Sequence, residues 1–528
     1  MKKYYITTPL YYVNGAPHIG HAYTQVVCDT ITRFYRQRAR HIFFMTGTDE
    51  HGIKIEKASI EAGFDEGKEK DFVDTIIPKF TSLWKRLNIE YDHFIRTTED
   101  YHKKEVQNIL QKIYDQGDIY PEVYKGFYCT PCEMFWSDTQ AVDGKCPDCG
   151  RKVDALNEKN YFFKMSKYKK ELVDKIEKDE IQVEPNIRKN EVLGFLNGNE
   201  LQDLCISRPK TRLKWGIELP FDKDFVSYVW FDALTNYVSG LKHKKGDSFD
   251  DHWDNVMHVI GKDIIRHHAI YWTIMLMAIG QKPPQKIFAH GWWMVGKEKM
   301  SKSKGNVLDP IYLLDVKKYP VDAIRYFLLS QVEFGYDGSF SEELFIEKYN
   351  SDLANDLGNL LNRSLNMVEK YFERIVPSTD IGSDCLNKEA VDLYAELMYS
   401  YEHVCMKVDS FLQIDGNKID FKTALGMLWD PVRRANKFIE VSAPWTCAKE
   451  NNTKALALIM GTLVQVLGKT AVLLYPFMPE TAQKMWEQLG MTNKVCDVNP
   501  EEFGALVIPV GTKVQKGEPL FPRLDKIG

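Results

Sequence analysis

The sequence predicts a doubly wound α/β domain with a parallel sheet, followed by an all-α helical bundle. The first observation is a short apolar strand at residues 4–8 that leads through a Pro- and Gly-containing loop into an amphipathic helix. The second is a set of apolar runs at residues 41–46, 256–260 and 287–291, which lead into Gly, Asp or His. Doubly wound sheets bind ligands at such carboxyl ends of strands. The third is the helical spacing of apolar residues that dominates from about residue 345 onward.

Length and composition indicate a soluble globular protein of several domains. The chain has 528 residues, too many for one core, so we expect two to four domains. Hydrophobic residues make up 44% of the chain and charged residues 27%, which is typical of a soluble protein. Because the net charge is −5, any surface that binds nucleic acid has to be a local basic patch.

The C-terminal half contains several long helical patterns. We expect helices at residues 349–370, 388–412, 421–441, 452–475 and 481–489. The most apolar segment, residues 455–475, contains Gln465 and Lys469, so we expect a buried helix rather than a membrane span. The start of the chain lacks the sustained apolar core of a signal peptide.

Residues 17–21 form a candidate nucleotide site. Pro17 lies just before the predicted helix, where its missing N–H costs nothing. His18 and His21 flank a helix N-terminus that follows a strand, where free N–H groups and the helix dipole attract phosphate. Gly20 would let a ligand lie against the backbone. A loop whose histidines only cap or pack the helix is an equal alternative for this stretch alone.

A second candidate for nucleotide chemistry is the Lys- and Ser-rich stretch at residues 299–303. The ordinary interpretation is a solvated, mobile loop. The functional one is a basic flap in which Lys299 and Lys302 close on nucleotide phosphates, with Lys302 as the main transition-state contact. Ser301, Ser303 and Gly305 are small enough to let such a flap move.

Four of the ten cysteines form two C-x-x-C pairs, which is a strong zinc signal. Cys129 and Cys132 make the first pair, and Cys146 and Cys149 make the second, with thirteen residues between the pairs. A redox role suits one such pair but explains two poorly. Four thiolates complete a tetrahedron without an open position, so we expect one structural zinc rather than a catalytic one. The scattered remaining cysteines fit a reducing compartment, and we expect a cytoplasmic protein.

Two carboxylates follow predicted strands of the sheet. Asp49 and Asp263 both lie at carboxyl ends, where Asp49 could meet a cationic group and Asp263 a ribose hydroxyl. A helix N-cap is the alternative for Asp49. The aromatic run at residues 225–237 is, on its pattern alone, more typical of a core than of a ligand pocket.

Together and in this order, residues 18–21 and 299–303 resemble the signatures of class I aminoacyl-tRNA synthetases. The further matches at Asp49, the cysteine pairs and residues 225–237 narrow this to a resemblance to the methionyl-tRNA synthetase family, over nearly the whole chain. The resemblance implies ATP-dependent attachment of L-methionine to initiator and elongator tRNA(Met) through a methionyl-adenylate, with Mg²⁺ accompanying ATP. Translation initiation and elongation would both use the product.

The resemblance also implies a role for each matching residue. The catalytic residues would be His18, His21, Lys299 and Lys302. The ATP site would contain these four together with Pro17, Gly20, Asp263 and His290. The methionine pocket would contain Leu10, Tyr12, Asp49, Arg208, Trp230, Ala233, Tyr237, Ile264 and His268. Within it, Asp49 would bind the amino group and Arg208 would help hold the carboxylate. Asn359, Arg363 and Trp445 would read the anticodon, the Trp445 ring by stacking on an unpaired base.

The same resemblance implies the domain boundaries. Residues 1–115 and 226–291 would be the two halves of a Rossmann-like catalytic domain, interrupted at 116–225 by a connective insertion with a single zinc knuckle. Residues 292–345 would be a stem-contact region with the loop at 299–303, and residues 346–528 a helical anticodon-binding domain. The tail at residues 510–523 resembles a strand that packs back across the bundle. We expect a monomer, or a dimer if a C-terminal domain is missing.

Three competing functions remain at this point. Another class I ligase, for valine, isoleucine, leucine or cysteine, is disfavoured by Asp49 in its Thr-Asp-Glu-His-Gly context and by the short insertion. A non-catalytic RNA-binding module derived from a synthetase would not need both nucleotide signatures. A small-molecule adenylyltransferase would share the histidine motif but not the helical half with Trp445.

Overall fold

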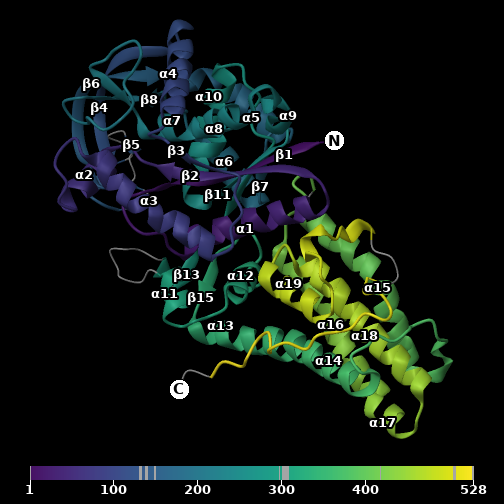
Figure 1. Ribbon diagram of the computed structural model, residues 1–528. Helices are drawn as coiled ribbons and strands as arrows, with labels where there is room; N and C mark the ends of the chain where they lie inside the picture. Colours follow the sequence, from purple (N-terminus) through teal and green to yellow (C-terminus); the bar gives the residue numbers. More distant parts are fainter. Residues whose placement is uncertain are drawn as a thin grey trace.

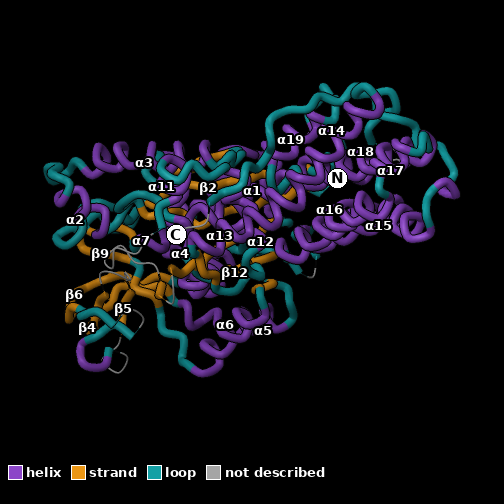
Figure 2. The backbone as a smooth tube through the Cα atoms, turned by 90° about the horizontal axis from the view of Figure 1, so that it is seen from below, coloured by secondary structure: helices purple, strands orange, loops and turns teal. Residues whose placement is uncertain are grey.

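The computed structural model describes residues 2–129, 134–136, 141–147, 150–295, 298–299, 308–416, 418–502 and 507–525. Figure 1 shows an elongated molecule with a sheet-containing part at one end and a helical bundle at the other. Seen from below in Figure 2, the strands β4, β5 and β6 lie at the end remote from α15–α18.

The sheet-containing part is organised around six parallel strands. Their order is β3-β2-β1-β11-β12-β7, so the chain builds outward from β1 through β2 to β3 and, in the other direction, from β11 to β12, with the earlier strand β7 at that edge. The strands are β1 (Lys3–Tyr12), β2 (His41–Asp49), β3 (His93–Arg96), β7 (Gln182–Glu184), β11 (Val256–Gly261) and β12 (Lys286–His290). The strand order therefore reverses between β1 and β11, which is where a doubly wound sheet opens a crevice.

Helices cover both faces of this sheet because successive strand residues point to opposite sides. Tyr4 and Ile6 of β1 belong to one core, and Tyr5 between them belongs to a second. The first core includes residues of α1 (Ile19–Gln37) and α3 (Glu69–Arg86). The second includes residues of α4 (Asp100–Asp115), α8 (Asn236–Lys245), α9 (Phe249–Trp253) and α10 (Thr273–Ala278). The doubly wound α/β fold with a parallel sheet is thus confirmed.

The insertion forms an antiparallel sheet of its own, in the order β5-β4-β6-β8. Its strands are β4 (Ile119–Cys129), β5 (Met134–Trp136), β6 (Asp154–Phe163) and β8 (Leu204–Cys205). Two helices, α5 (Lys169–Glu177) and α6 (Asn186–Gly198), flank β7 in the sequence. Because β7 pairs with β12, the range 116–225 that we assigned to the insertion also supplies a strand of the central sheet. A strand of three residues is too short to show a periodicity in the sequence.

A third, small sheet follows the central one and leads toward the bundle. It has the order β14-β13-β15, built from β13 (Trp293–Val295), β14 (Glu298–Lys299) and β15 (Gly338–Phe340). Two helices, α11 (Pro310–Asp315) and α12 (Val321–Ser330), lie between β14 and β15 in the chain. α12 packs on α1 and on the bundle helix α16 (Phe421–Ser442), so it joins the two parts of the molecule.

The C-terminal part is the expected helical bundle. Its helices are α13 (Glu342–Lys348), a π-helical stretch (Tyr349–Gly358) that continues into α14 (Asn359–Phe372), α15 (Lys388–Leu412), α16, α17 (Pro444–Lys449), α18 (Thr453–Leu474) and α19 (Pro479–Gln488). By length and apolar composition α18 could cross a membrane, but 94% of its most apolar window is buried inside the protein. It is therefore the central helix of the bundle, as the sequence predicts.

The tail returns across the bundle as an extended segment, as expected. The N–H of Val376 donates to the carbonyl of Thr512, and that of Val514 donates to the carbonyl of Arg374. Farther along, the Tyr349 hydroxyl donates to the carbonyl of Pro522 at 2.9 Å. The pairing amounts to one isolated bridge rather than a strand within a sheet.

A buried ionic cluster links α1 to the bundle. The Asp29 carboxylate on α1 lies 2.8 Å from Nε of Arg33 and 2.6 Å from Nη2 of Arg325 on α12. Arg325 also donates to the carbonyls of Pro476 and Phe477, which connect α18 to α19. Burial alone would raise the pKa of Asp29, but the two guanidinium groups hold it below its usual value. α1 is thus fixed near its middle by charges that are costly to separate.

Candidate active site

A cavity of about 400 Å³ opens at the reversal point of the central sheet. It is lined by Pro9, Leu10, Tyr11, Tyr12, Asn14, His18, Gly20, His21, Thr24, Trp230, Gly261, Asp263, Ile264, His290, Gly291, Trp292 and Trp293. These residues come from the ends of β1, β11 and β12, the start of α1 and the helix α7 (Val229–Leu234). Residues predicted for nucleotide binding and residues predicted for methionine binding therefore share one cavity.

The two histidines of the first motif cap helix α1. His18 is the N-cap residue, and its Nδ1 accepts the N–H of Gly20 at 3.1 Å. The N–H of His18 donates in turn to Nδ1 of His21 at 3.2 Å, and the two rings stack with centroids 3.7 Å apart. A protonated imidazole has no acceptor nitrogen, so this geometry assigns both rings as neutral with the proton on Nε2. Each ring therefore carries its N–H on Nε2, at the N-terminus of helix α1 where the dipole favours negative charge.

The nucleotide side of the cavity continues to the ends of β11 and β12. Nδ1 of His290 donates to the carbonyl of Gly291 at 2.8 Å, which leaves Nε2 to accept from the Thr24 hydroxyl, also at 2.8 Å. Burial lowers the pKa of His290, so the ring is neutral. Asp263 accepts the indole N–H of Trp292 at 3.2 Å, which orients this carboxylate at the cavity wall.

The other side of the cavity is apolar and aromatic. Tyr12 and Trp230 meet edge to face with ring centroids 6.4 Å apart, and Leu10 and Ile264 complete this wall. Such a surface suits a side chain that packs well and forms weak hydrogen bonds.

A buried hydrogen-bonded pair lies behind that wall. Nδ1 of His268 donates to the carbonyl of Ile264 at 2.9 Å, and its Nε2 accepts the Tyr237 hydroxyl at 2.8 Å. Burial lowers the pKa of His268 to about 4, so the ring is uncharged at neutral pH. His268 and Tyr237 therefore support Ile264 rather than line the cavity themselves.

Comparison with known proteins gives matches over the whole chain. A family model described as class I tRNA synthetases (M) matches residues 4–158 and 151–365, and the anticodon-binding domain of methionyl tRNA ligase matches residues 407–526. The methionine–tRNA ligase of Caldanaerobacter subterraneus subsp. tengcongensis is 45% identical over 99% of this chain and 79% of its own length. That of Clostridium perfringens is 46% identical over 99% of this chain and 78% of its own length.

The chain belongs to the methionyl-tRNA synthetase family. A solved structure agrees with this assignment. The Mycobacterium tuberculosis methionyl-tRNA synthetase in complex with methionyl-adenylate superimposes with a TM-score of 0.89 at 36% identity, covering 99% of this chain and 100% of the other. The enzyme class that the sequence resembled, a class I methionine–tRNA ligase, is thereby confirmed, and the non-catalytic and adenylyltransferase alternatives fall away.

Three further residues of the predicted synthetase site lie close to the cavity or its strands without lining it. Asp49 ends β2 in register with Tyr12 of β1, so its backbone adjoins the aromatic wall. Ala233 is buried on α7, close to Trp230 in the sequence. Pro17 is buried in the loop just before the cap of α1.

Arg208 lies outside the cavity lining. Its guanidinium is held between the rings of Tyr128 and Tyr228, 4.9 and 4.8 Å from their centroids, and Nη1 donates to the carbonyl of Ser207 at 2.6 Å. The predicted contact with the methionine carboxylate remains a prediction, because in this arrangement the side chain packs in the strand region of β9 (Ser207–Pro209) and β10 (Phe225–Ser227).

The loop and the metal site predicted for this synthetase lie partly outside the described residues. The backbone of Lys299 belongs to β14, whereas Lys302 is not described. Cys129 and Cys146 are buried in one small cluster with Trp136, and Cys132 and Cys149 are not described. Within the described part of the chain, no group of three or more His, Cys, Asp or Glu residues could hold a metal ion.

The predicted anticodon residues lie on two helices of the bundle, α14 and α17. Asn359 and Arg363 are one turn apart on α14, and Arg363 forms an ion pair with Glu440 of α16 at 2.7 Å. Trp445 follows at the start of α17 with 42% of its surface exposed. An exposed indole at the start of a helix can stack on an unpaired base.

The sequence prediction missed several residues of the cavity. Thr24 lies one turn after Gly20 on the same helix face, a spacing that could have revealed it. Asn14 and Trp292 are in loops, where no periodicity indicates which way a side chain points.

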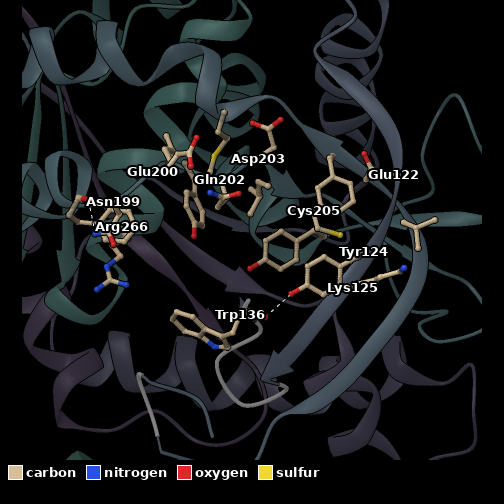
Figure 3. A pocket seen from close by; sticks show the side chains of 18 residues that line it. Glu122, Tyr124, Lys125, Trp136, Asn199, Glu200, Gln202, Asp203, Cys205 and Arg266 are labelled. Atoms are coloured by element: carbon tan, nitrogen blue, oxygen red, sulfur yellow. Dashed lines mark hydrogen bonds between the residues drawn. The ribbon is translucent and has the colours of Figure 1, made fainter. Parts of the chain in front are cut away.

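A second cavity of about 360 Å³ lies between the insertion and α6 (Figure 3). The hydroxyl of Tyr124 donates to the carbonyl of Trp136 at 3.0 Å on its wall, and Arg266 lies at its edge. None of the predicted site residues lines this cavity. Those predicted site residues that line a cavity therefore line the first one.

The buried histidines predict that stability falls in acid. The pKa of His268 is lowered to about 4, as is that of His93, whereas an unfolded histidine titrates near 6.5. Between these values the unfolded state binds more protons than the folded state, so stability rises with pH. Stability is therefore lost as pH falls from about 6.5 toward 4, and His268, which is fully buried, accounts for up to about 3 kcal/mol of the lost free energy of unfolding.

The measurement is the urea midpoint of unfolding at several pH values, for the natural protein and for His268→Gln. We expect the substituted protein to lose less stability between pH 7 and pH 5, because one buried imidazole no longer has to remain neutral. The same loss in both proteins would show that His268 does not stay neutral in the folded state.

Proposed function

We propose that this chain attaches L-methionine to initiator and elongator tRNA(Met) in two steps, and that the cavity at the reversal of the sheet performs the first. One observation carries the proposal: the histidines that cap α1, Asp263 and an apolar aromatic wall all line one cavity. Family membership and the methionyl-adenylate in the solved relative support the same reaction.

In the first step the methionine carboxylate attacks the α-phosphate of ATP and pyrophosphate leaves. The barrier is mainly one of positioning and charge, so no covalent nucleophile on the protein is needed. His18 and His21 present Nε2–H donors at a helix N-terminus, where negative charge develops on the phosphate oxygens. Because both rings are already fixed by the helix cap, they need no reorganisation during the reaction.

Lys299 and Lys302 are proposed to form a basic flap that stabilises the remaining negative charge on the phosphate oxygens. Lys302 is proposed to be the main contact. Mg²⁺ entering with ATP would neutralise phosphate charge. Asp263, which Trp292 orients, is proposed to accept a hydrogen bond from a ribose hydroxyl. His290 is proposed to form part of the same ATP site.

Methionine recognition is proposed to use the apolar wall. A thioether packs well against aromatic rings, and Tyr12 and Trp230 provide them. The neutral His268 adds no formal charge behind the wall, and the ammonium group of Lys54 lies 4.3 Å from the centroid of the Tyr12 ring. Asp49 is proposed to bind the amino group of the substrate at the end of β2.

The second step transfers methionyl to the terminal ribose of tRNA, with the bundle holding the anticodon. Trp445 is proposed to stack on an unpaired base, with Asn359 and Arg363 contacting its neighbours. We propose a cytoplasmic location on the strength of the cysteine content, which suits a reducing compartment.

The experiment that tests the function is ATP–pyrophosphate exchange with each amino acid in turn. We expect exchange with methionine, lowered at least about a hundredfold by Asp49→Ala, because an ion pair to the substrate is lost. Asp254→Ala, at an exposed ion pair with Lys282, is the matched control and should keep full activity.

Exchange with a different amino acid would agree with the enzyme class but contradict the proposed specificity for methionine. No exchange with any amino acid, from folded protein, would contradict the proposed function itself.

We further propose that Cys129, Cys132, Cys146 and Cys149 hold one structural zinc ion. The support is the spacing of the pairs and the burial of Cys129 and Cys146 in the same cluster. The thiolates would close the coordination shell, so the metal would fix the insertion and take no part in the reaction.

Metal analysis of the purified, reduced protein tests the zinc proposal. We expect one zinc per chain, lost in Cys146→Ser together with a lower midpoint of thermal unfolding. Cys405→Ser, at a buried cysteine of α15 remote from the insertion, should keep the metal. Folded protein without zinc, or Cys146→Ser protein with full zinc content, would contradict the proposal.

A further inference from the structure

A buried carboxylate lies behind the aromatic wall of the first cavity. Asp232 of α7 is 1% exposed, and its neighbours Phe231 and Leu234 belong to the apolar core. A carboxylate in such surroundings is costly unless its oxygens are hydrogen-bonded. The hydrogen bonds of Asp232 therefore have to offset the cost of burying its carboxylate.

Two buried histidines supply those hydrogen bonds. Nδ1 of His51 lies 2.7 Å from Oδ2 of Asp232, and Nε2 of His102 lies 2.8 Å from Oδ1. The opposite nitrogen of His102 lies 2.7 Å from the hydroxyl of Ser239, which can donate to it. A carboxylate only accepts, so both imidazole nitrogens that face Asp232 carry protons. Burial would raise the pKa of Asp232, but the two histidines hold it below its usual value.

The elements joined in this way carry two residues of the predicted amino-acid site, Asp49 and Trp230. His51 follows β2 two residues after Asp49, in the turn that leads to α2 (Ile53–Glu61). Asp232 follows Trp230 by two residues on α7. His102 anchors the same carboxylate to α4 on the far side. The link thus fixes the distance between the end of β2 and the helix that presents Trp230.

We propose that Asp232 is a positioning residue for methionine, which acts through His51 to hold Asp49 at a fixed distance from Trp230. The proposal rests on the proposed function, in which Asp49 binds the amino group and Trp230 contacts the side chain. A substrate held at both ends requires these two groups at one separation. The nucleotide half of the cavity comes from α1, β11 and β12, which the link does not touch.

The test compares the KM for methionine with the KM for ATP in pyrophosphate exchange. For Asp232→Asn we expect the KM for methionine to rise about tenfold to a hundredfold, as for the loss of a charged hydrogen bond, with the KM for ATP within about twofold. The matched control is Asp322→Asn, a buried aspartate that accepts the N–H of Thr481 far from the cavity. It should leave both constants unchanged.

Two substitutions of His51 keep the test decisive if Asp232→Asn does not fold, because both leave Asp232 bonded to His102. His51→Ala removes the donor and should raise the KM for methionine. His51→Asn keeps an amide donor near the position of Nδ1, so its KM for methionine should lie within about threefold of that of the unsubstituted protein. Equal effects of the two substitutions, or a parallel rise of both KM values, would overturn the proposal.

The unsubstituted protein separates this inference from the proposed function. If it shows no methionine-dependent exchange, the function fails. If it does and the Asp232 and His51 variants keep its KM for methionine, only the positioning role fails.

Discussion

Helix α1 begins with a reciprocal cap, and the rest of the site depends on it. His18 accepts from the backbone of Gly20 and donates its own backbone N–H to His21. These two hydrogen bonds satisfy N–H groups that every helix N-terminus leaves free. They also fix the tautomers of both rings, so the groups that start the helix are the same groups that line the cavity.

The helix that carries the cap is held in place farther along its length. α1 is almost entirely buried, and Asp29 near its middle is bound by Arg33 and Arg325. Arg325 in turn bonds to the connection between α18 and α19 of the bundle. A rigid helix therefore runs from the nucleotide side of the cavity to the anticodon-binding part, and its position is set by charges that cannot be separated cheaply.

The sequence predicted the elements whose patterns are long and missed those that depend on distant partners. The helix at residues 388–412 has the predicted bounds, because its apolar periodicity continues for 25 residues. The strand β7 was assigned to the insertion, because three residues carry no pattern and only its pairing with β12 reveals its place.

The same limit applies to the site. His18, Gly20 and His21 are adjacent in the chain, so their common location follows from one strand–turn–helix unit. The link between His51 and Asp232 joins positions 181 residues apart, and no local spacing announces it. The placement of Arg208 between two tyrosine rings is likewise a tertiary property. Family resemblance supplied the roles predicted for His18, Gly20, His21 and Arg208, whereas the structure shows that the first three line one cavity.

The most direct measurement is pyrophosphate exchange by His21→Asn, together with its thermal unfolding. Asn keeps an acceptor near the position of Nδ1, so the helix cap survives, but it has no Nε2–H to offer the phosphate. The account predicts an unchanged unfolding midpoint and exchange lowered about a hundredfold, as for the loss of one oriented donor. Exchange within about threefold of the natural protein would contradict it, because the cap alone would then be sufficient for activity.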